Sequence, residues 1–126
     1  MRTIAIVEDA KDNRDLLFYL LGDEYRVLRY GNGEEAVRAF AAEAPDLIVM
    51  DIGLADVDGV EVLKRLRQQE NFRNIPIVAL TAHAMSGDRD KYLVAGFDEY
   101  VSKPIMDIDV FRAMVQSLLD SSESGN

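Results

Sequence analysis

The chain contains no cysteine and only one histidine among its 126 residues. Without cysteine there can be no disulfide, no thiolate nucleophile and no cysteine-ligated zinc. The single histidine, His83, argues against a transition-metal centre, because such centres draw mainly on imidazole and thiolate ligands. The sequence thus excludes cysteine chemistry and disfavours a transition-metal enzyme.

Basic residues and long apolar runs are also scarce. The 14 lysines and arginines stand against 23 acids, which gives a formal net charge of −9. Because nucleic-acid affinity comes largely from cationic side chains that neutralise phosphates, direct contact with nucleic acid or anionic lipid is disfavoured. The first apolar run, Ile4 to Val7, is too short for a secretion signal or a membrane span. We therefore expect a cytoplasmic protein without a membrane segment.

The length and composition predict one globular domain. A chain of 126 residues with 48% hydrophobic and 29% charged residues is long and apolar enough to bury a single core. We expect this domain to cover residues 1–120, followed by a polar, frayed tail over residues 121–126. Met1 just before the first apolar run and this polar tail favour a stand-alone protein.

Short apolar runs alternate with segments of helical period, a pattern typical of a parallel sheet with crossover helices. The predicted strands are Thr3–Glu8, Tyr25–Arg29, Leu47–Met50, Ile77–Leu80 and Glu99–Ser102. The stretches Ile4–Val7, Leu47–Met50 and Ile77–Leu80 are apolar throughout, as strands covered on both faces must be, so the first, third and fourth strands should be central. The second and fifth are mixed and suit the edges. The sequence therefore predicts a five-stranded, doubly wound α/β fold with strand order 2-1-3-4-5.

Five helices are predicted from apolar residues at one-face spacing and from stop signals. The fourth is expected from about Met85 to Ala95, ending at Gly96, while Gly22 and Pro45 close the first and second. The residues expected to face the core are Leu16, Leu17, Leu20, Leu21, Ala36, Val37, Phe40, Ala41, Val60, Leu63, Leu66, Val110, Phe111, Met114, Val115 and Leu118.

Polar, chemically active residues follow the predicted strands. In an open doubly wound sheet, a site forms beyond the carboxyl ends of the strands where the strand order reverses, here between strands one and three. The residues at the strand ends are Glu8, Asp9, Asp51, Thr81 and Lys103. The sequence therefore predicts three carboxylates, a hydroxyl and an ammonium group at one edge of the sheet.

Closely spaced carboxylates repel one another, so such a cluster needs a cation or a shared proton. Magnesium suits it best, because this ion prefers octahedral oxygen coordination and retains several waters. We expect Asp9 and Asp51 to be direct ligands and Glu8 to bind directly or through water. The backbone carbonyl of Gly53, in the loop after the third strand, can supply another oxygen.

A carboxylate can also attack phosphorus and form an aspartyl phosphate, and Asp51 is the candidate. Phosphoryl transfer depends on positioning and charge neutralisation, so it requires a metal, a fixed cation and a hydrogen-bond donor. Lys103 and Thr81 supply the cation and the donor.

Each of these residues, taken alone, also has a purely structural interpretation. Glu8 or Asp9 could cap the helix that follows, and Thr81 could cap another. Lys103 could be a solvated surface lysine. The joint placement of these residues on strand ends favours a functional site. His83, just past the fourth strand, is either a surface residue at a helix start or a residue that modulates the site.

With these motifs in place, the chain resembles the receiver domains of response regulators over residues 2–120. The motifs in the family's order and approximate spacing are Glu8-Asp9, Asp51, Asp58-Gly59, Thr81-Ala82 and Tyr100-Val101-Ser102-Lys103-Pro104. The block from Thr81 to Asp88 further resembles receivers of hybrid kinases and of stand-alone phosphorelay regulators. The resemblance implies a flavodoxin-like (βα)5 fold and a role in two-component signal transduction.

The resemblance also implies a reaction. A phosphoryl group would pass from a phosphohistidine on a histidine kinase or histidine phosphotransfer protein to Asp51, with magnesium required, and would later be hydrolysed. The domain itself would catalyse both steps and switch its binding to a downstream protein target. A cis peptide bond before Pro104 would aim Lys103 at the phosphoryl group.

Tyr100 is similar in position to the family's switching aromatic. Thr81 would move toward the phosphoryl group, and the ring of Tyr100 would turn inward into the space that Thr81 leaves. The alternative is a half-buried edge-strand tyrosine with its hydroxyl in water.

The chain departs from the family pattern at two points. Leu54-Ala55 stands where methionine-proline is frequent, which should loosen the loop. Gly53 stands where a bulkier polar residue is frequent, which affects the hydrolysis rate and leaves His83, next to Ala82, as the candidate modulating residue.

Three other functions compete with this interpretation. An aspartate-nucleophile phosphohydrolase would usually have a second acid two residues after the nucleophile, where this chain has Gly53, and it would need an insertion for a substrate cap. A binding module that is never phosphorylated has no need for three repelling carboxylates. A receiver excised from a hybrid histidine kinase would share the chemistry and differ only in context.

Overall fold

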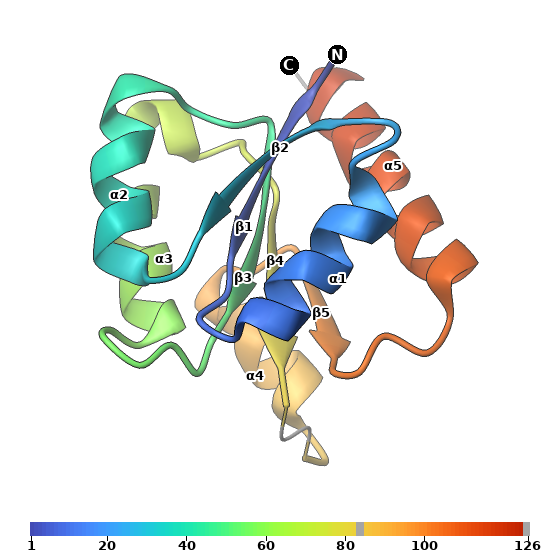
Figure 1. Cartoon of the computed structure of the whole chain (residues 1–126). Coiled ribbons are helices and arrows are strands. Elements are labelled where there is room, and N and C mark those ends of the chain that lie inside the picture. The colour runs from blue at the N-terminus through green and yellow to red at the C-terminus, as the bar shows by residue number, and fades with distance from the viewer. Residues whose placement is uncertain (83–84, 125–126) are drawn as a thin grey trace.

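The computed structural model of the chain describes residues 1–82 and 85–124. Its five strands form one parallel sheet, and a helix follows each strand (Figure 1). The strands are β1 (Thr3–Val7), β2 (Arg26–Tyr30), β3 (Leu47–Asp51), β4 (Ile77–Thr81) and β5 (Glu99–Ser102). Their spatial order is β2-β1-β3-β4-β5, which confirms the predicted fold class and strand order.

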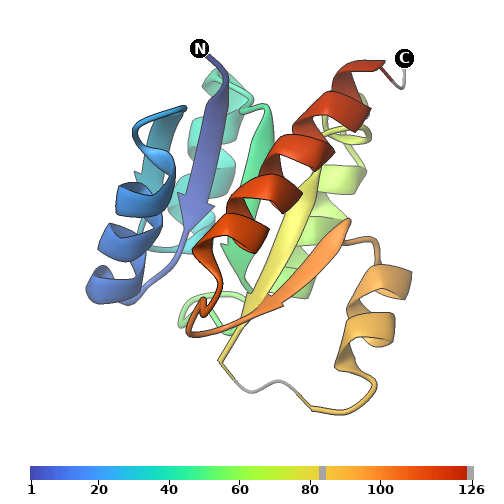
Figure 2. The ribbon, with the colours of Figure 1, turned by 90° about the vertical axis from the view of Figure 1, so that its right-hand side faces the viewer.

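The helices cover both faces of the sheet. They are α1 (Lys11–Leu21), α2 (Gly33–Ala42), α3 (Gly59–Arg67), the short 3-10 helix η1 (Glu70–Phe72), α4 (Asp88–Ala95) and α5 (Ile108–Ser124). α1 and α5 lie on one face, and α2, α3 and α4 lie on the other (Figures 1 and 2). Among the described residues, no helix has both the length and the apolar character needed to cross a membrane.

Successive residues of the central strands enter different cores, because side chains in a strand point alternately to opposite faces. In β1, Ile4 and Ile6 pack toward α1 and α5. Ala5 and Val7, from the same strand, pack toward α2 and α3. β1, β3 and β4 are buried almost throughout, as their apolar composition predicted.

β1 ends one residue earlier than predicted, and β2 starts and ends one residue later, at Arg26 and Tyr30. β1 ends at Val7 because the carbonyl of Glu8 accepts a hydrogen bond from the Arg14 guanidinium at 2.9 Å rather than from a strand. β2 starts at Arg26 because Tyr25 belongs to the turn that ends α1, where its N–H donates to the Leu21 carbonyl at 3.1 Å.

β3 and β4 are each one residue longer than predicted. The parallel register continues through Asp51, which pairs with Leu80, and through Thr81, which pairs with Ser102. Two of the expected site residues are therefore the last residues of central strands and are held by the sheet.

The predicted start of the fourth helix at Met85 is wrong. α4 begins at Asp88, because Gly87 adopts a left-handed φ of 87° that a continuous right-handed helix does not contain. The carboxylate of Asp88 accepts the N–H of Met85 at 2.9 Å and closes the preceding turn. The helix ends at Ala95, before Gly96 with φ 125°, as predicted.

Three residues predicted to face the core are exposed instead, namely Leu16, Val110 and Ala41, which lies in the last turn of α2. Leu16 is 41% exposed, because the buried stripe of α1 contains only Leu17, Leu20 and Leu21. Val110 is 64% exposed, because it lies in the first turn of α5 at the rim of an apolar hollow.

α5 continues to Ser124, into the segment expected to form a frayed tail. The hydroxyl of Ser122 donates to the carbonyl of Asn74 at 3.1 Å, which holds this part of the helix against the segment before β4. Residues 125–126 lie outside the described part of the chain.

Arg67 joins the segments at the amino ends of the strands. Its Nη1 donates to the carbonyls of Phe72 and Ile75 at 2.6 and 2.7 Å. Its Nη2 donates to the carbonyl of Gly96 at 3.2 Å and to Oδ2 of Asp98 at 2.8 Å. One guanidinium group thus ties α3 and η1 to the start of β4 and the end of α4.

Replacing Arg67 with methionine should lower the free energy of unfolding by about 3 kcal/mol, because several carbonyls and a carboxylate lose their donor together. Lys64→Met, at an exposed position one turn earlier on α3, should change it by less than about 0.5 kcal/mol. Urea unfolding of both variants and the wild type measures the difference. Equal stabilities for the two variants would show that the Arg67 contacts contribute nothing beyond a surface charge.

Candidate functional site

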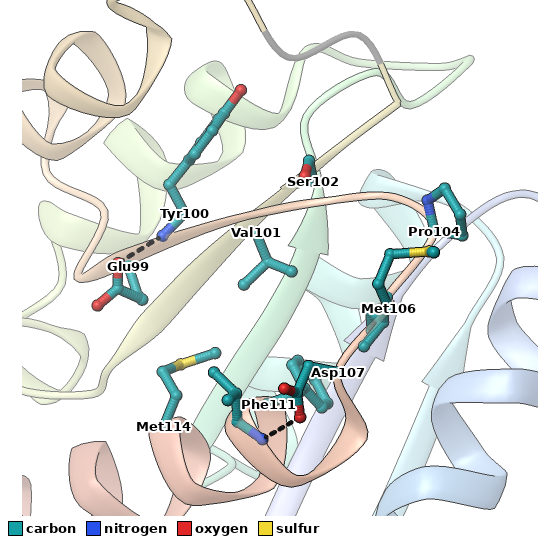
Figure 3. Close-up of a pocket in the computed structure, with 11 residues that line it drawn as sticks. Glu99, Tyr100, Val101, Ser102, Pro104, Met106, Asp107, Phe111 and Met114 are labelled. Carbon is teal, nitrogen blue, oxygen red and sulfur yellow. Dashed lines mark hydrogen bonds between the residues drawn. The ribbon is translucent and has the colours of Figure 1, made fainter.

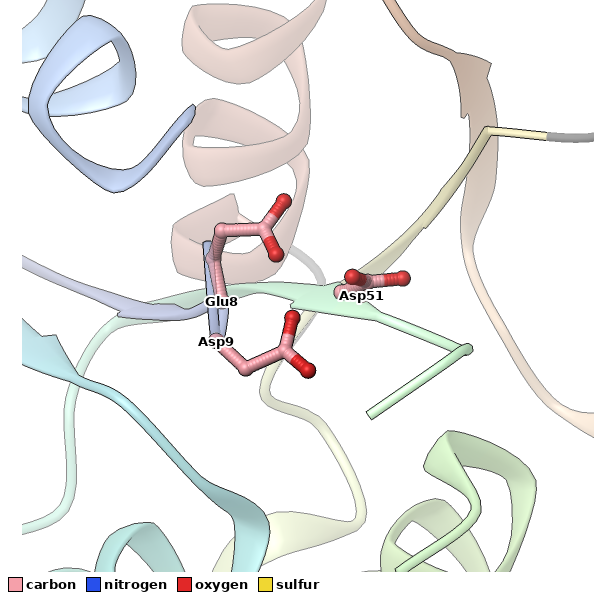
Figure 4. Close-up of side chains that lie close together, drawn as sticks. All are labelled: Glu8, Asp9 and Asp51. Carbon is pink, nitrogen blue, oxygen red and sulfur yellow. The ribbon is translucent and has the colours of Figure 1, made fainter. Parts of the chain in front are cut away.

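Three carboxylates meet at the carboxyl ends of β1 and β3, where the strand order reverses. Glu8 and Asp9 follow β1, and Asp51 ends β3 (Figure 4). One oxygen from each lies within 4.8 Å of the others. Glu8 is 0% and Asp51 is 5% exposed, whereas Asp9 is exposed. The predicted acidic cluster is therefore present, and one of its members is open to solvent.

Lys103, directly after β5, reaches into this cluster. Its Nζ lies 2.8 Å from Oε1 of Glu8 and 3.0 Å from Oδ2 of Asp51. The backbone N–H of Lys103 donates to the carbonyl of Thr81 at 2.7 Å, which fixes the lysine beside the end of β4. The Lys103–Pro104 peptide bond is cis, as the resemblance implied. Lys103 is thus a largely buried partner of two carboxylates, with 13% of its side chain exposed, and its interpretation as a solvated surface lysine is wrong.

Burial and hydrogen bonding oppose each other in this cluster. Burial raises the pKa of the Glu8 carboxyl, and the nearby Asp51 adds to the rise, while the hydrogen bond from Lys103 limits it. Burial alone would lower the pKa of Lys103, but its hydrogen bonds to Glu8 and Asp51 outweigh burial and raise it. The ammonium group therefore stays charged between its two partners.

The residues present fit a hard divalent cation. Lys103 pairs with two of the three carboxylates, Glu8 and Asp51, and its single positive charge leaves negative charge in excess. All three groups offer oxygen, the ligand that magnesium prefers. The exposure of Asp9 leaves a route for the ion and its waters.

Arg14 is a site-supporting residue that the sequence analysis missed. Its Nη1 donates to the backbone carbonyls of Glu8 and Asp9, at 2.9 and 3.5 Å. These contacts fix the backbone of both acids from the first turns of α1. Gly31 leaves room for this side chain, since a Cβ there would lie 3.3 Å from Nη1 of Arg14.

A hollow of about 530 Å³ opens beside Asp51. Thr81, the last residue of β4, and the exposed Ala82 after it line this hollow, as expected for residues at the carboxyl end of a strand. His83 lies outside the described residues, so both of its interpretations stay predictions. The outer wall comes from the start of α4 and the turn before it, with Met85, Asp88, Lys91 and Tyr92. These four were not predicted as site residues.

Tyr100 lies against α4, with its ring stacked on that of Tyr92 at 5.6 Å between centroids and 10° between planes. Its hydroxyl oxygen is buried. Burial raises the pKa of the Tyr100 hydroxyl, and the charge of Asp88 adds to the rise. The interpretation of this residue as an edge tyrosine with its hydroxyl in water is therefore wrong.

A second hollow, of about 520 Å³, lies between β5 and α5 (Figure 3). Val101 points toward Phe111 and Met114 at its base, and Tyr100 points away from them. Met106, at its rim, is 86% exposed. β5 thus separates an apolar surface hollow from the stacked tyrosines.

The loop from β3 to α3 follows Asp51 directly. The N–H of Gly53 donates to Oδ1 of Asp51 at 2.8 Å. Further along, Asp56 binds the first turn of α2, with Oδ1 accepting from Gly33 N–H and Oδ2 from Glu34 N–H, each at 3.0 Å. No sequence pattern had indicated this contact.

Comparisons with known proteins agree with this geometry. A sequence model described as the response regulator receiver domain matches residues 4–116. The polar-differentiation response regulator DivK of Brucella anthropi is 41% identical over 105 residues, which are 82% of this chain and 85% of that protein. The chain therefore belongs to the response regulator receiver family, and its place in two-component signalling is confirmed.

Solved structures of similar sequence support the same assignment. The receiver domain of a signal transduction histidine kinase from Syntrophus aciditrophicus has a TM-score of 0.86 and 31% identity, covering 96% of this chain and 92% of that one. The receiver domain of a sensor histidine kinase from Pseudomonas aeruginosa has a TM-score of 0.85 and 36% identity. The match covers 95% of this chain and 98% of that one. That structure contains a magnesium ion coordinated in its active-site cleft.

The Asp56 contact predicts a pH-dependent stability. Hydrogen bonds from the N–H groups of Glu34 and Gly33 lower the pKa of Asp56 below its ordinary value. A depressed folded-state pKa stabilises the fold above the unfolded pKa of roughly 4, and this contribution is lost as pH falls through the folded value.

We therefore expect Asp56→Asn to be less stable than the wild type at pH 7, with a difference that shrinks below about pH 4 as the wild-type carboxylate is protonated. Urea unfolding at several pH values measures it. A stability difference that is the same at pH 7 and pH 3 would contradict the charged contact.

Proposed function

We propose that this receiver domain accepts a phosphoryl group on Asp51 in a magnesium-dependent reaction and thereby switches partner binding. One observation carries the proposal: Lys103 joins Asp51 and Glu8 while Asp9 stays exposed within 4.8 Å of both. This arrangement provides an acceptor, a fixed cation and an oxygen-rich cation site at one point.

The proposed magnesium ligands are the carboxylates of Asp9 and Asp51 and the backbone carbonyl of Gly53, with Glu8 binding directly or through water. When bound, the ion neutralises charge on the acceptor carboxylate and on the phosphoryl oxygens. The relatives' family and the magnesium site of the Pseudomonas aeruginosa receiver support this assignment.

In the proposed transfer, one carboxylate oxygen of Asp51 forms a bond to phosphorus as the nitrogen–phosphorus bond of the donor phosphohistidine breaks. The donor imidazole leaves with the electron pair. Lys103 keeps its positive charge beside Oδ2 of Asp51, where it attracts the incoming phosphoryl oxygens, and the hydroxyl of Thr81 donates to a phosphoryl oxygen. The donor is a histidine kinase or a histidine phosphotransfer protein.

Hydrolysis of the aspartyl phosphate completes the proposed cycle, so the domain catalyses its own phosphorylation and dephosphorylation and turns over no separate substrate. A Cβ at Gly53 would lie 3.6 Å from Oδ1 of Asp51, an ordinary contact, so the glycine leaves open space beside the acceptor. Ala82 and His83, which follow β4 in the sequence, are the proposed modulating residues for the attacking water.

Thr81 and Tyr100 are the proposed switch. The ring of Tyr100 already occupies a buried position on Tyr92, so phosphorylation acts by favouring this position once Thr81 is drawn toward the phosphoryl group. The face formed by α4, β5 and α5 then presents a different surface to a downstream protein. The apolar hollow beside Val101 and Met106 lies on this face.

The proposed setting is the cytoplasm, without a nucleic-acid or membrane partner, as the net charge of −9 favours. DivK is a response regulator, and the Syntrophus aciditrophicus structure is a receiver from a histidine kinase. The proposed chemistry is the same for a stand-alone regulator and for a receiver within a kinase. The rival phosphohydrolase has no support at Gly53, where the second acid is missing.

Asp51→Asn should abolish labelling by acetyl phosphate or by a phosphorylated kinase, because the amide lacks the nucleophilic charge. Asp58→Asn, in the same loop, should still be labelled, because Asp58 caps α3 through the N–H of Val60 at 2.8 Å. Mass spectrometry locates the modified residue. Normal labelling of the Asp51 variant would show that another group is the acceptor.

Asp9→Ala should raise the dissociation constant for magnesium by at least about tenfold, because it removes a direct ligand. Asp12→Ala, which removes an exposed acid from α1, should change it by less than about twofold. Calorimetric titration with magnesium chloride measures both. Equal affinities in the two variants would exclude Asp9 from the ligand set.

A further inference from the structure

We infer that Asp56 is a positioning residue for the acceptor site, which fixes the β3–α3 loop and with it the Gly53 carbonyl by binding α2. The inference rests on the proposed function, because it assigns Asp56 an effect on magnesium affinity. Asp56 itself touches neither the proposed ion nor the acceptor; it acts through the loop.

The loop is closed on itself and fastened to α2. The N–H of Gly59 donates to the carbonyl of Ile52 at 3.1 Å and closes its two ends. At its tip, both carboxylate oxygens of Asp56 are used by the first turn of α2, one on Gly33 and one on Glu34. Two parallel hydrogen bonds to one carboxylate fix its orientation as well as its position.

Packing reinforces these hydrogen bonds. A Cβ at Gly33 would lie 2.5 Å from Cγ1 of Val57 and 3.4 Å from Cδ1 of Leu54, so the start of α2 rests directly on the loop. The contact is possible because residue 33 is glycine. The loop therefore has one well-defined place against α2, and Asp56 supplies the polar half of that contact.

The loop needs this anchor because its own sequence restrains it little. Ala55 leaves the backbone φ unrestrained where a proline would fix it, and Gly53 has no side chain to pack. Magnesium requires near-ideal octahedral geometry at about 2.0–2.1 Å, so a small displacement of the Gly53 carbonyl weakens binding. The expected loosening of the loop is thus opposed by Asp56.

A residue that only caps α2 would not position the Gly53 carbonyl. Asn32 is such a residue and serves as a matched control for Asp56. The Asn32 side chain also caps α2, accepting the N–H of Glu35 at 2.8 Å. It precedes α2 directly and makes this hydrogen bond within the helix start. Loss of either cap destabilises α2, but only loss of Asp56 releases the loop.

The test compares the wild type with Asp56→Ala, Asp56→Asn and Asn32→Ala. Asp56→Ala should raise the magnesium dissociation constant about tenfold, the lower end for groups that orient metal ligands, and Asp56→Asn should raise it less. The magnesium dissociation constant of Asn32→Ala should stay within about twofold of the wild-type value. Its loss of free energy of unfolding should be similar to that of Asp56→Ala. Amide exchange over residues 52–57 should accelerate in Asp56→Ala and not in Asn32→Ala.

Labelling by acetyl phosphate supplies a second measurement. In Asp56→Ala the rate should fall at low magnesium and recover at saturating magnesium, because Asp51 and Lys103 are intact. Equal magnesium affinities for Asp56→Ala and Asn32→Ala would overturn the inference. If Asp56→Ala does not fold, an Asp56→Asn affinity equal to that of Asn32→Ala would overturn it in the same way.

Failure of the proposed function gives a different result. A wild type that binds magnesium but is never labelled would refute phosphorylation of Asp51, while the affinities of the variants would still decide the role of Asp56. A wild type that does not bind magnesium would overturn both.

Discussion

The ammonium group of Lys103, held between Glu8 and Asp51, is the contact on which the site depends. It joins segments that lie 95 and 52 residues away in the chain, at 2.8 and 3.0 Å. One positive charge cannot balance three carboxylates whose oxygens lie within 4.8 Å of one another. The residual negative charge makes this edge of the sheet suitable for a hard cation. A bound cation would in turn reduce the repulsion between these carboxylates and incoming phosphoryl oxygens.

Different parts of the fold position this site with different rigidity. Asp51 and Thr81 end central strands, where the parallel ladder and burial on both faces hold them. The Gly53 carbonyl lies in the seven-residue connection between β3 and α3, whose sequence contains few conformationally restricted residues, and the position of that connection depends on the hydrogen bonds between Asp56 and α2. The position of the proposed acceptor is therefore fixed by the sheet, whereas the proposed metal geometry is fixed by α2, a helix that covers one face of the sheet (Figure 1).

The sheet and the acidic cluster could be predicted because both follow from local rules. Strands buried on both faces must be apolar throughout, and active residues gather where such strands end. The start of α4 could not be predicted, because the left-handed conformation of Gly87 depends on the turn around it. The contacts of Arg14 and Asp56 could not be predicted either, because both side chains bind backbone groups. Nearly every residue carries the same backbone carbonyl and N–H, so the sequence does not identify these partners. The exposure of Leu16 likewise depends on how wide a stripe of α1 the sheet can cover.

The most direct test of the central claim is a crystal structure of the chain with magnesium and beryllofluoride, a mimic of the phosphoryl group. The account predicts beryllofluoride on Asp51, an ion bound by Asp9, Asp51 and the Gly53 carbonyl, and Lys103 in contact with a fluoride. Magnesium bound elsewhere, or beryllofluoride absent from Asp51 at saturating concentration, would contradict it.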